Sequence, residues 1–293
     1  MITTRSTLHP VLAAWTKTVE LLRSNTALFT PLGLAAGVKL TMVGVALVAP
    51  FTPFSKFLAP IVRYFWGEIF LHYPYHLALA TRWFRRSDLL LPILLEGFLV
   101  GMTAYLCRQI LAGHPVKVRQ AFSETFRRYP GCVLITMVSS LLMIGLAKMA
   151  LLPIQLGVRW FPILAQSTFA MALGMALVTI AVVAALESLF IFALPSCILE
   201  QRAWFRAIGR SVQIAAKSYG SIFLTIFIVT LAYLPFVLLR QGSIRMVTSS
   251  WPESILLVYI GRILFTWVIG TMLAVWGTVY LTEHAGASRE VVG

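Results

Sequence analysis

Acidic residues, histidines and cysteines are scarce in this sequence, and their scarcity limits the chemistry that it can carry. Its 293 residues include only 10 Asp and Glu, five His and three Cys, so few acid–base or metal-binding groups can form. The cysteines Cys107, Cys132 and Cys197 are odd in number and widely spaced, which argues against a disulfide framework and against a thiolate zinc site. We expect all three to be reduced, small apolar side chains near the cytoplasmic ends of spans.

The sequence motifs of common enzymes are missing as well. Gly-x-Ser-x-Gly, a phosphate-binding glycine-rich loop, His-Glu-x-x-His and Cys-x-x-Cys do not occur. The sequence also holds no ATP-binding module that could drive transport. It therefore predicts a protein that is not an enzyme and that uses no cofactor.

Charge is sparse, whereas apolar residues are abundant. Charged residues make up 12% of the chain, against about 25% in soluble globular domains. Apolar residues make up 59%, and the mean hydropathy is +0.86. Long apolar runs exceed the roughly 18 residues that mark a membrane span, and they lack the alternation of barrel strands. This composition excludes a soluble enzyme, a disordered chain, a fibrous repeat and a secreted disulfide scaffold, and it predicts an all-α polytopic membrane helix bundle.

Six apolar runs are predicted to cross the membrane as helices. They are Leu28–Ala49, Leu89–Ile110, Cys132–Leu152, Phe169–Ile198, Ile222–Leu239 and Ile255–Leu281. The fourth run is longer than the about 20 residues that a span needs, so we expect it to tilt or to extend beyond the hydrocarbon.

The segment from Phe57 to Ala80 leaves two alternatives open. It is apolar, but it also contains Arg63, Glu68, two histidines and Pro74. We interpret it as an interfacial or re-entrant segment, and the alternative is a seventh span. A seventh span would reverse the orientation of every span after it.

Basic residues outside the spans predict the orientation. The formal net charge is +14, and the basic residues form short clusters beside apolar runs, which favours anionic lipid headgroups over nucleic acid as the partner. The clusters at 117–128 and 202–217 fall on one side, which we assign to the cytoplasm together with both termini. A further cluster at 82–86 then falls on the opposite side.

An internal repeat is predicted within a single membrane domain that covers residues 1–293. An amphipathic helix precedes each odd-numbered span, so that interfacial helix, outward span and returning span form a unit that occurs three times, at about 8–110, 116–198 and 200–283. Residues 8–25 are amphipathic and charged, so we interpret them as the first interfacial helix and not as a cleavable signal peptide. The apolar stripes comprise Leu8, Val11, Leu12, Trp15, Val19 and Leu22, then Val118, Phe122 and Phe126, then Trp204, Phe205, Ile208, Val212 and Ala215.

One stretch resembles a known family. Pro195-Ser196-Cys197-Ile198-Leu199-Glu200, followed by Ala207-Ile208-Gly209-Arg210-Ser211 and by Lys217 at the entry to a span, is similar to the membrane domain of some glycerophosphoryl diester phosphodiesterases and to its stand-alone bacterial relatives. The region from Trp15 to Pro31 is similar to the opening segment of that family. The resemblance implies a six-helix bacterial inner-membrane protein. The phosphodiesterase domain itself is absent, so the resemblance implies no catalytic residue.

Charges within the spans are the first candidates for function, because burying a charge in hydrocarbon costs roughly 2.5–3.5 kcal/mol. These intramembrane residues are Lys39, Glu96, Lys148, Glu187 and Arg262. Glu96 and Glu187 each follow a leucine in a similar sequence context, and we expect both at similar depths, near the middle of the membrane. Two interpretations remain: a proton or cation pathway in a polar cavity, or structural pairing with Lys39 or Lys148. Lys148 and Arg262 could also extend to the outer headgroups.

Two other groups of residues are weaker candidates. Glu68, His72 and His76 are spaced by four and could line one helix face, as in metal sites, but Pro74 interrupts that helix, so we expect an interfacial aromatic anchor and no metal. A basic stripe on the third interfacial helix is expected to set the topology and to contact anionic lipid or a protein partner. It consists of Arg202, Arg206, Arg210 and Lys217.

Three hypotheses of function follow from these candidates. The favoured one is a non-catalytic membrane component that organises lipid or docks a partner through its basic cytoplasmic helices. The second is a secondary transporter or lipid flippase that uses Glu96 and Glu187. The third is an intramembrane enzyme, for which only Glu68, His72 and His76 approach a suitable set.

Overall fold

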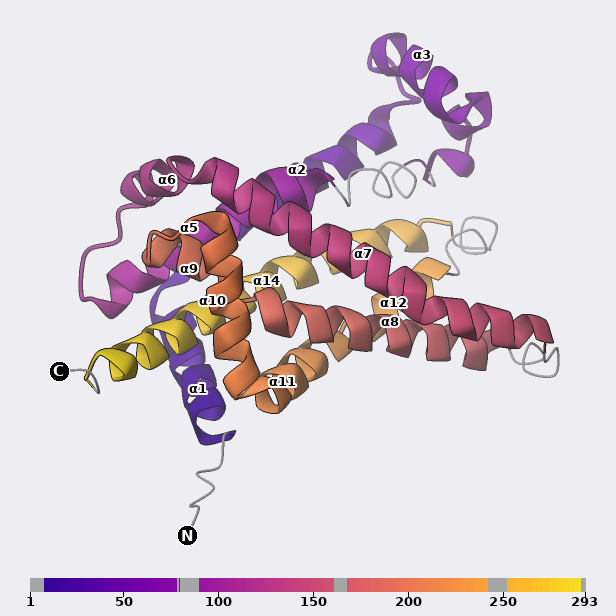
Figure 1. The fold of residues 1–293 in the computed structure, drawn as a ribbon. Helices are drawn as coiled ribbons and strands as arrows, with labels where there is room; N and C mark the ends of the chain where they lie inside the picture. Colours follow the sequence, from indigo (N-terminus) through magenta and orange to yellow (C-terminus); the bar gives the residue numbers. More distant parts are fainter. Residues whose placement is uncertain (1–7, 78, 80–89, 161–167, 242–251, 291–293) are drawn as a thin grey trace.

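The computed structural model describes residues 8–77, 79, 90–160, 168–241 and 252–290, and the regular elements of these residues are all helical (Figure 1). Five segments are long and apolar enough to cross a membrane, and a sixth results if the bent pair Trp204–Lys217 and Tyr219–Leu231 is one span. The five are Thr26–Val48, Pro92–Leu111, Tyr129–Ala150, Met171–Leu199 and Ser254–Glu283. The predicted all-α membrane class is confirmed, and each of the six predicted runs overlaps one of these segments.

The helices follow one another along the chain in this order. The first group is α1 (Leu8–Ser24), η1 (Thr26–Phe29), α2 (Thr30–Val48), α3 (Ser55–Trp66), η2 (Glu68–Leu71), η3 (Pro92–Glu96) and α5 (Gly97–Leu111). The second is α6 (Val118–Phe126), α7 (Tyr129–Trp160), α8 (Thr168–Phe190) and α9 (Ala193–Leu199). The third is α10 (Trp204–Lys217), α11 (Tyr219–Leu231), α12 (Leu234–Gln241) and α14 (Ser254–Glu290). Figure 1 places α1, α6 and α10 toward the end of the molecule at which α14 finishes, whereas α3 lies at the other end.

Two of the predicted spans are broken helices. The fourth changes from α8 to α9 at Ile191 and Phe192, and the fifth changes from α11 to α12 at Ala232 and Tyr233. Pro195 and Pro235 follow these breaks. Since proline has no N–H, it cannot bond to the carbonyl four residues earlier, and the helix is interrupted there.

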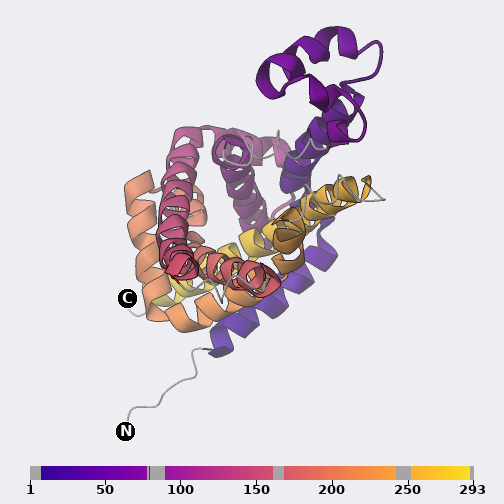
Figure 2. The same cartoon turned by 90° about the vertical axis from the view of Figure 1, so that its right-hand side faces the viewer.

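The segment after α2 does not form a candidate span in the described residues. Helix α3 has 12 residues, about 18 Å of helix, and η2 adds a single short turn. Phe57 and Tyr64 on α3 are 76% and 84% exposed. Figures 1 and 2 both show α3 standing apart from the rest of the bundle. These features favour the interfacial alternative over a seventh span; the basic cluster at 82–86 lies outside the described residues.

Helix α5 is the most enclosed of the candidate spans, and two glycines allow its neighbours to come close. A Cβ atom at Gly97 would overlap the hydroxyl of Thr136 on α7. A Cβ at Gly101 would lie 3.1 Å from Ile198 on α9 and 3.2 Å from Thr125 on α6. Small residues four apart permit this close packing within membranes, where helix association depends on contact rather than on hydrophobicity. The contact joins α5 to three other helices.

Helices α6 and α10, predicted to be interfacial, turn their large apolar side chains outward. On α6, Phe122 and Phe126 are exposed, whereas Ala121 and Thr125 are buried. On α10, Trp204, Phe205 and Val212 are exposed, and the buried residues are Ala207, Ser211, Ile214 and Ala215. Helix α1 is mixed, with Val11 and Leu22 buried but Leu12 and Val19 exposed. The small residues therefore face the bundle, where helices approach closely, and most of the predicted apolar stripes face the surroundings.

Candidate functional site

An ion pair joins α2 to the turn that precedes α5. Lys39 Nζ contacts Glu96 Oε1, and their side chains are only 13% and 21% exposed. Glu96 is the last residue of η3, a π-helical turn that begins at Pro92. π-Helical turns occur mostly as single turns inside α-helices, and frequently at functional sites. The pairing neutralises two of the predicted intramembrane charges against each other.

A second polar group lies around Tyr233, at the break between α11 and α12. The Tyr233 hydroxyl is within hydrogen-bonding range of the Thr266 side chain and within electrostatic range of Glu187, Arg262 and Glu96. Its ring packs edge-on against Phe265 with 4.9 Å between the centroids. Polar side chains from α8, α14, η3 and the break between α11 and α12 therefore lie in one region. The two glutamates that the sequence places at similar depths both contribute to the field at Tyr233.

The structure distinguishes the two glutamates by their partners. Glu96 has Lys39, whereas the Glu187 carboxylate forms no ion pair or side-chain hydrogen bond among the described residues. Lys148, the other lysine proposed as a partner, has an exposed side chain on α7. Arg262 is half-buried on α14. Sequence reasoning overlooked Tyr233, although its place two residues before a proline within an apolar run was a usable signal.

Only part of the predicted basic stripe lies on α10, because Arg202 precedes this helix, and Glu200 lies close to two of the arginines. Arg202 Nε lies 2.5 Å from Glu200 Oε2, and Arg210 Nε lies 3.9 Å from Glu200 Oε1. Arg206 lies over the ring of Phe205 at 5.7 Å from its centroid, and Lys217 is exposed at the end of the helix. A carboxylate thus offsets part of the charge of two arginines, while Arg206 and Lys217 remain available to ligands.

The residues considered for a metal site are separated. Glu68 pairs with Arg63 at 2.9 Å, and His72 is exposed. The His76 ring is buried between Phe51 and Tyr73, and desolvation lowers the pKa of His76 below its ordinary value. In the part of the chain that the structure describes, no three His, Cys, Asp or Glu side chains gather closely enough to hold an ion. Exposed aromatic residues such as Tyr64 and Tyr73 are compatible with the predicted aromatic anchor.

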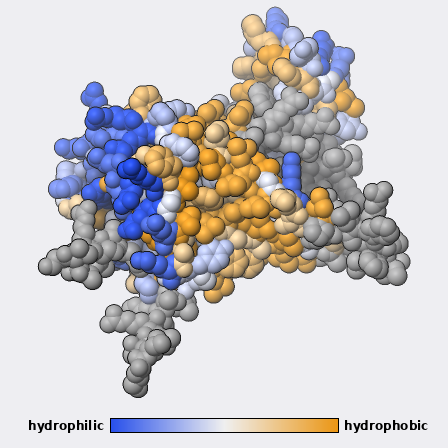
Figure 3. Space-filling view, in the orientation of Figure 1, coloured by the Kyte–Doolittle hydropathy of each residue, from blue (hydrophilic) through white to orange (hydrophobic). Residues whose placement is uncertain are grey.

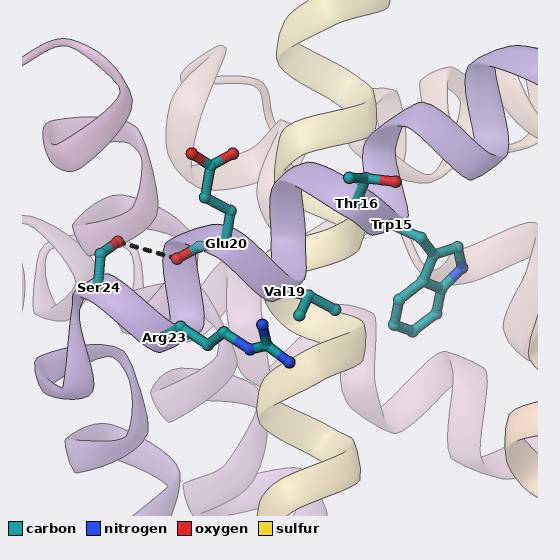
Figure 4. Close-up of a pocket in the computed structure, with 6 residues that line it drawn as sticks. All are labelled: Trp15, Thr16, Val19, Glu20, Arg23 and Ser24. Atoms are coloured by element: carbon teal, nitrogen blue, oxygen red, sulfur yellow. Dashed lines mark hydrogen bonds between the residues drawn. The ribbon is translucent and has the colours of Figure 1, made fainter.

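Neither of two surface pockets formed by described residues is lined by Glu96 or Glu187. One of about 760 Å³ runs along α1 and is lined by Trp15, Thr16, Val19, Glu20, Arg23 and Ser24. Figure 4 shows the Glu20 carboxylate and the Arg23 guanidinium pointing to opposite sides of α1, and the Ser24 hydroxyl donating to the Glu20 carbonyl oxygen at 2.9 Å. Because all of these side chains come from one helix and diverge, they do not form a converging site.

The other pocket, of about 400 Å³, lies where α5 passes into α6. Its lining is basic and polar, and it consists of Tyr105, Arg108, Gln109, Ala112, His114, Pro115, Lys117 and Gln120. Its side chains come from the last turns of α5, the connecting loop and the first turn of α6. The groups converge, in contrast to those along α1.

These features together are those of a multi-pass α-helical membrane protein with a small polar centre between its helices. Its candidate site residues come from several helices, as is usual where polar groups face the interior of a bundle. No family model matches the sequence, and neither a curated protein nor a solved structure matches it.

Proposed function

We propose that this chain is a non-catalytic component of a bacterial cytoplasmic membrane that organises anionic lipid around its basic end. In this proposal both termini are cytoplasmic, and the chain consists of three units, each with an interfacial helix, an outward span and a returning span. Helices α1, α6 and α10 are the interfacial helices of the three units. Their common placement toward one end in Figure 1 supports this arrangement.

One observation carries the proposal: large apolar side chains lie exposed beside basic ones on these helices. Phe205 is 55% exposed next to Arg206, and Phe126 is 58% exposed next to Arg127. Figure 3 shows a hydrophilic end next to a broad hydrophobic band. A surface of this kind is unfavourable in water, but it suits the boundary between acyl chains and anionic headgroups.

Lipid retention tests this proposal. We expect the purified protein to retain phosphatidylglycerol over phosphatidylcholine when both are supplied in mixed micelles, as measured by native mass spectrometry. Since a basic residue near an anionic surface contributes about 1 kcal/mol, the two substitutions Arg206→Gln and Lys217→Gln together remove about 2 kcal/mol and should weaken retention of phosphatidylglycerol about thirtyfold.

The charge-conserving pair Arg206→Lys and Lys217→Arg is the control and should bind like the parent protein. Equal retention of the two lipids by the parent protein would overturn the proposal. In the other form of the favoured hypothesis, a protein partner docks on the same helices. The variant with Arg206→Gln and Lys217→Gln would then lose that partner and not its lipid.

A second candidate function is secondary transport or lipid flipping through the polar centre. The observation that favours it is Glu187, a carboxylate without an ion-pair partner in the described residues that lies in the same field as Arg262 and Tyr233. It predicts that liposomes containing the protein move a fluorescent phosphatidylglycerol between leaflets faster than empty liposomes. Glu187→Gln should abolish this movement and Glu187→Asp should retain part of it. Movement no faster than in empty liposomes would contradict this function.

A further inference from the structure

The loop after α5 folds back on the helix that precedes it. Gly113 adopts a left-handed backbone with φ of +70°, a conformation that favours glycine, and it ends α5. The His114 N–H donates to the Gln109 carbonyl at 2.9 Å, so the chain reverses at once. As a result, His114 and Lys117 return to the last turns of α5 and line, together with Arg108, the open 400 Å³ pocket.

The pocket has a positive lining that other contacts hold in place. Arg108 donates to the Leu199 carbonyl at 2.9 Å, which uses one of its five N–H donors and anchors its side chain. The Gln109 side chain accepts from the Lys117 backbone N–H and donates to the Gln120 side chain, both at 3.4 Å. The charged side chains of the lining, Arg108 and Lys117, are both basic, and no carboxylate is among the described lining residues.

The first turn of α6 adds to the attraction for an anion. Lys117 is the N-cap of this nine-residue helix and makes no side-chain cap, and no acidic residue occupies the first turn. The N–H groups at a helix start attract negative charge, and here they adjoin the basic pocket. The acidic residue farther along the helix, Glu124, contacts Arg127 at 3.8 Å and does not line the pocket.

We infer that this pocket binds a phosphate group, carried either by an anionic phospholipid or by free phosphate. Arginine and lysine donors, a histidine and an uncapped helix start are complementary to phosphate oxygens. The volume lies within the range of small-molecule sites. Tyr105 and Pro115 offer apolar surface to the glycerol part of a lipid headgroup. The inference rests on the proposed function when the ligand is a lipid, because it assigns a specific site to lipid binding.

A pair of matched charge reversals tests the pocket. Lys117 lines it, whereas Arg119 is exposed on the same first turn of α6 and does not. We expect Lys117→Glu to weaken binding of phosphatidylglycerol by the full-length protein in detergent about tenfold, and Arg119→Glu to change it less than about threefold. Binding is measured by lipid titration with native mass spectrometry, and binding of inorganic phosphate is measured in parallel by calorimetry.

The outcomes separate this inference from the proposed function. If the parent protein binds phosphatidylglycerol and Lys117→Glu abolishes that binding, the ligand is a lipid. If the parent protein binds inorganic phosphate in the calorimeter and Lys117→Glu abolishes that binding, the ligand is free phosphate. Equal losses of lipid binding in Lys117→Glu and Arg119→Glu would overturn the assignment of the site to this pocket. The proposed function, a generally basic and lipid-binding surface, would still stand. Absence of both lipid and phosphate binding in the parent protein would overturn both. If Lys117→Glu does not fold, Lys117→Gln replaces it, because it removes the charge without introducing a carboxylate.

Discussion

Gly97→Leu is expected to destabilise the helix bundle severely. A Cβ atom at this position already overlaps the Thr136 hydroxyl, and the Thr136 Cβ is only 3.1 Å away. Overpacking a tight core costs about 1–3 kcal/mol for smaller insertions, and a whole leucine should exceed that range. We expect the thermal midpoint of the purified protein in detergent to fall by about 10 °C or more, measured by intrinsic fluorescence.

Gly145 on α7 provides the matched control. No atom lies within 4 Å of a Cβ built there, so Gly145→Leu should leave the thermal midpoint within about 2 °C of the parent value or raise it slightly through helix propensity. The smaller change Gly97→Ala should be partly rescued by Thr136→Ala, which removes the overlapping hydroxyl. If Gly97→Leu and Gly145→Leu melt alike, the close contact between α5 and α7 does not exist.

The spans could be predicted because hydropathy is a local property of the sequence. The six apolar runs emerge from composition and length alone, and even the breaks before Pro195 and Pro235 were signalled by residues whose missing N–H has a known effect. The direction in which α6 and α10 turn their apolar side chains was not predictable in this way. In a soluble protein the large side chains of α6 and α10 would face inward, whereas here the small side chains Ala121 and Ala207 are buried and Phe122 and Phe205 are exposed.

The candidate site was predictable in its residue types but not in its pairings. Glu200 lies close in sequence to Arg202 and Arg210, so their pairing could have been anticipated. The partner of Glu96 comes from a different helix, and its choice depends on how the spans pack, which local pattern does not specify. For the same reason, Glu96 and Glu187 look equivalent in sequence, although only one of them has a lysine beside it.

Separating Lys39 from Glu96 should be nearly as damaging as overpacking Gly97. Glu96→Gln leaves an uncompensated lysine among the spans, and Lys39→Met leaves a carboxylate in the same position. Removing one partner of a buried ion pair costs about 3–5 kcal/mol, whereas removing both is often far less harmful. We expect each single variant to lower the thermal midpoint by about 10 °C, and the double variant Lys39→Met with Glu96→Gln to recover at least half of that loss.

Glu187→Gln is the internal comparison, because its carboxylate has a similar sequence context but no ion pair with a described cation. It should shift the thermal midpoint by less than about 3 °C, since no pair is broken. Equal destabilisation by Glu96→Gln and Glu187→Gln, or additive losses in the double variant, would contradict an isolated Lys39–Glu96 pair. The polar centre would then act as one coupled network around Tyr233, and both glutamates would have to be assigned the same role. With the expected result, Glu96 acts as a helix-joining residue, and any proton or cation chemistry in the membrane depends on Glu187.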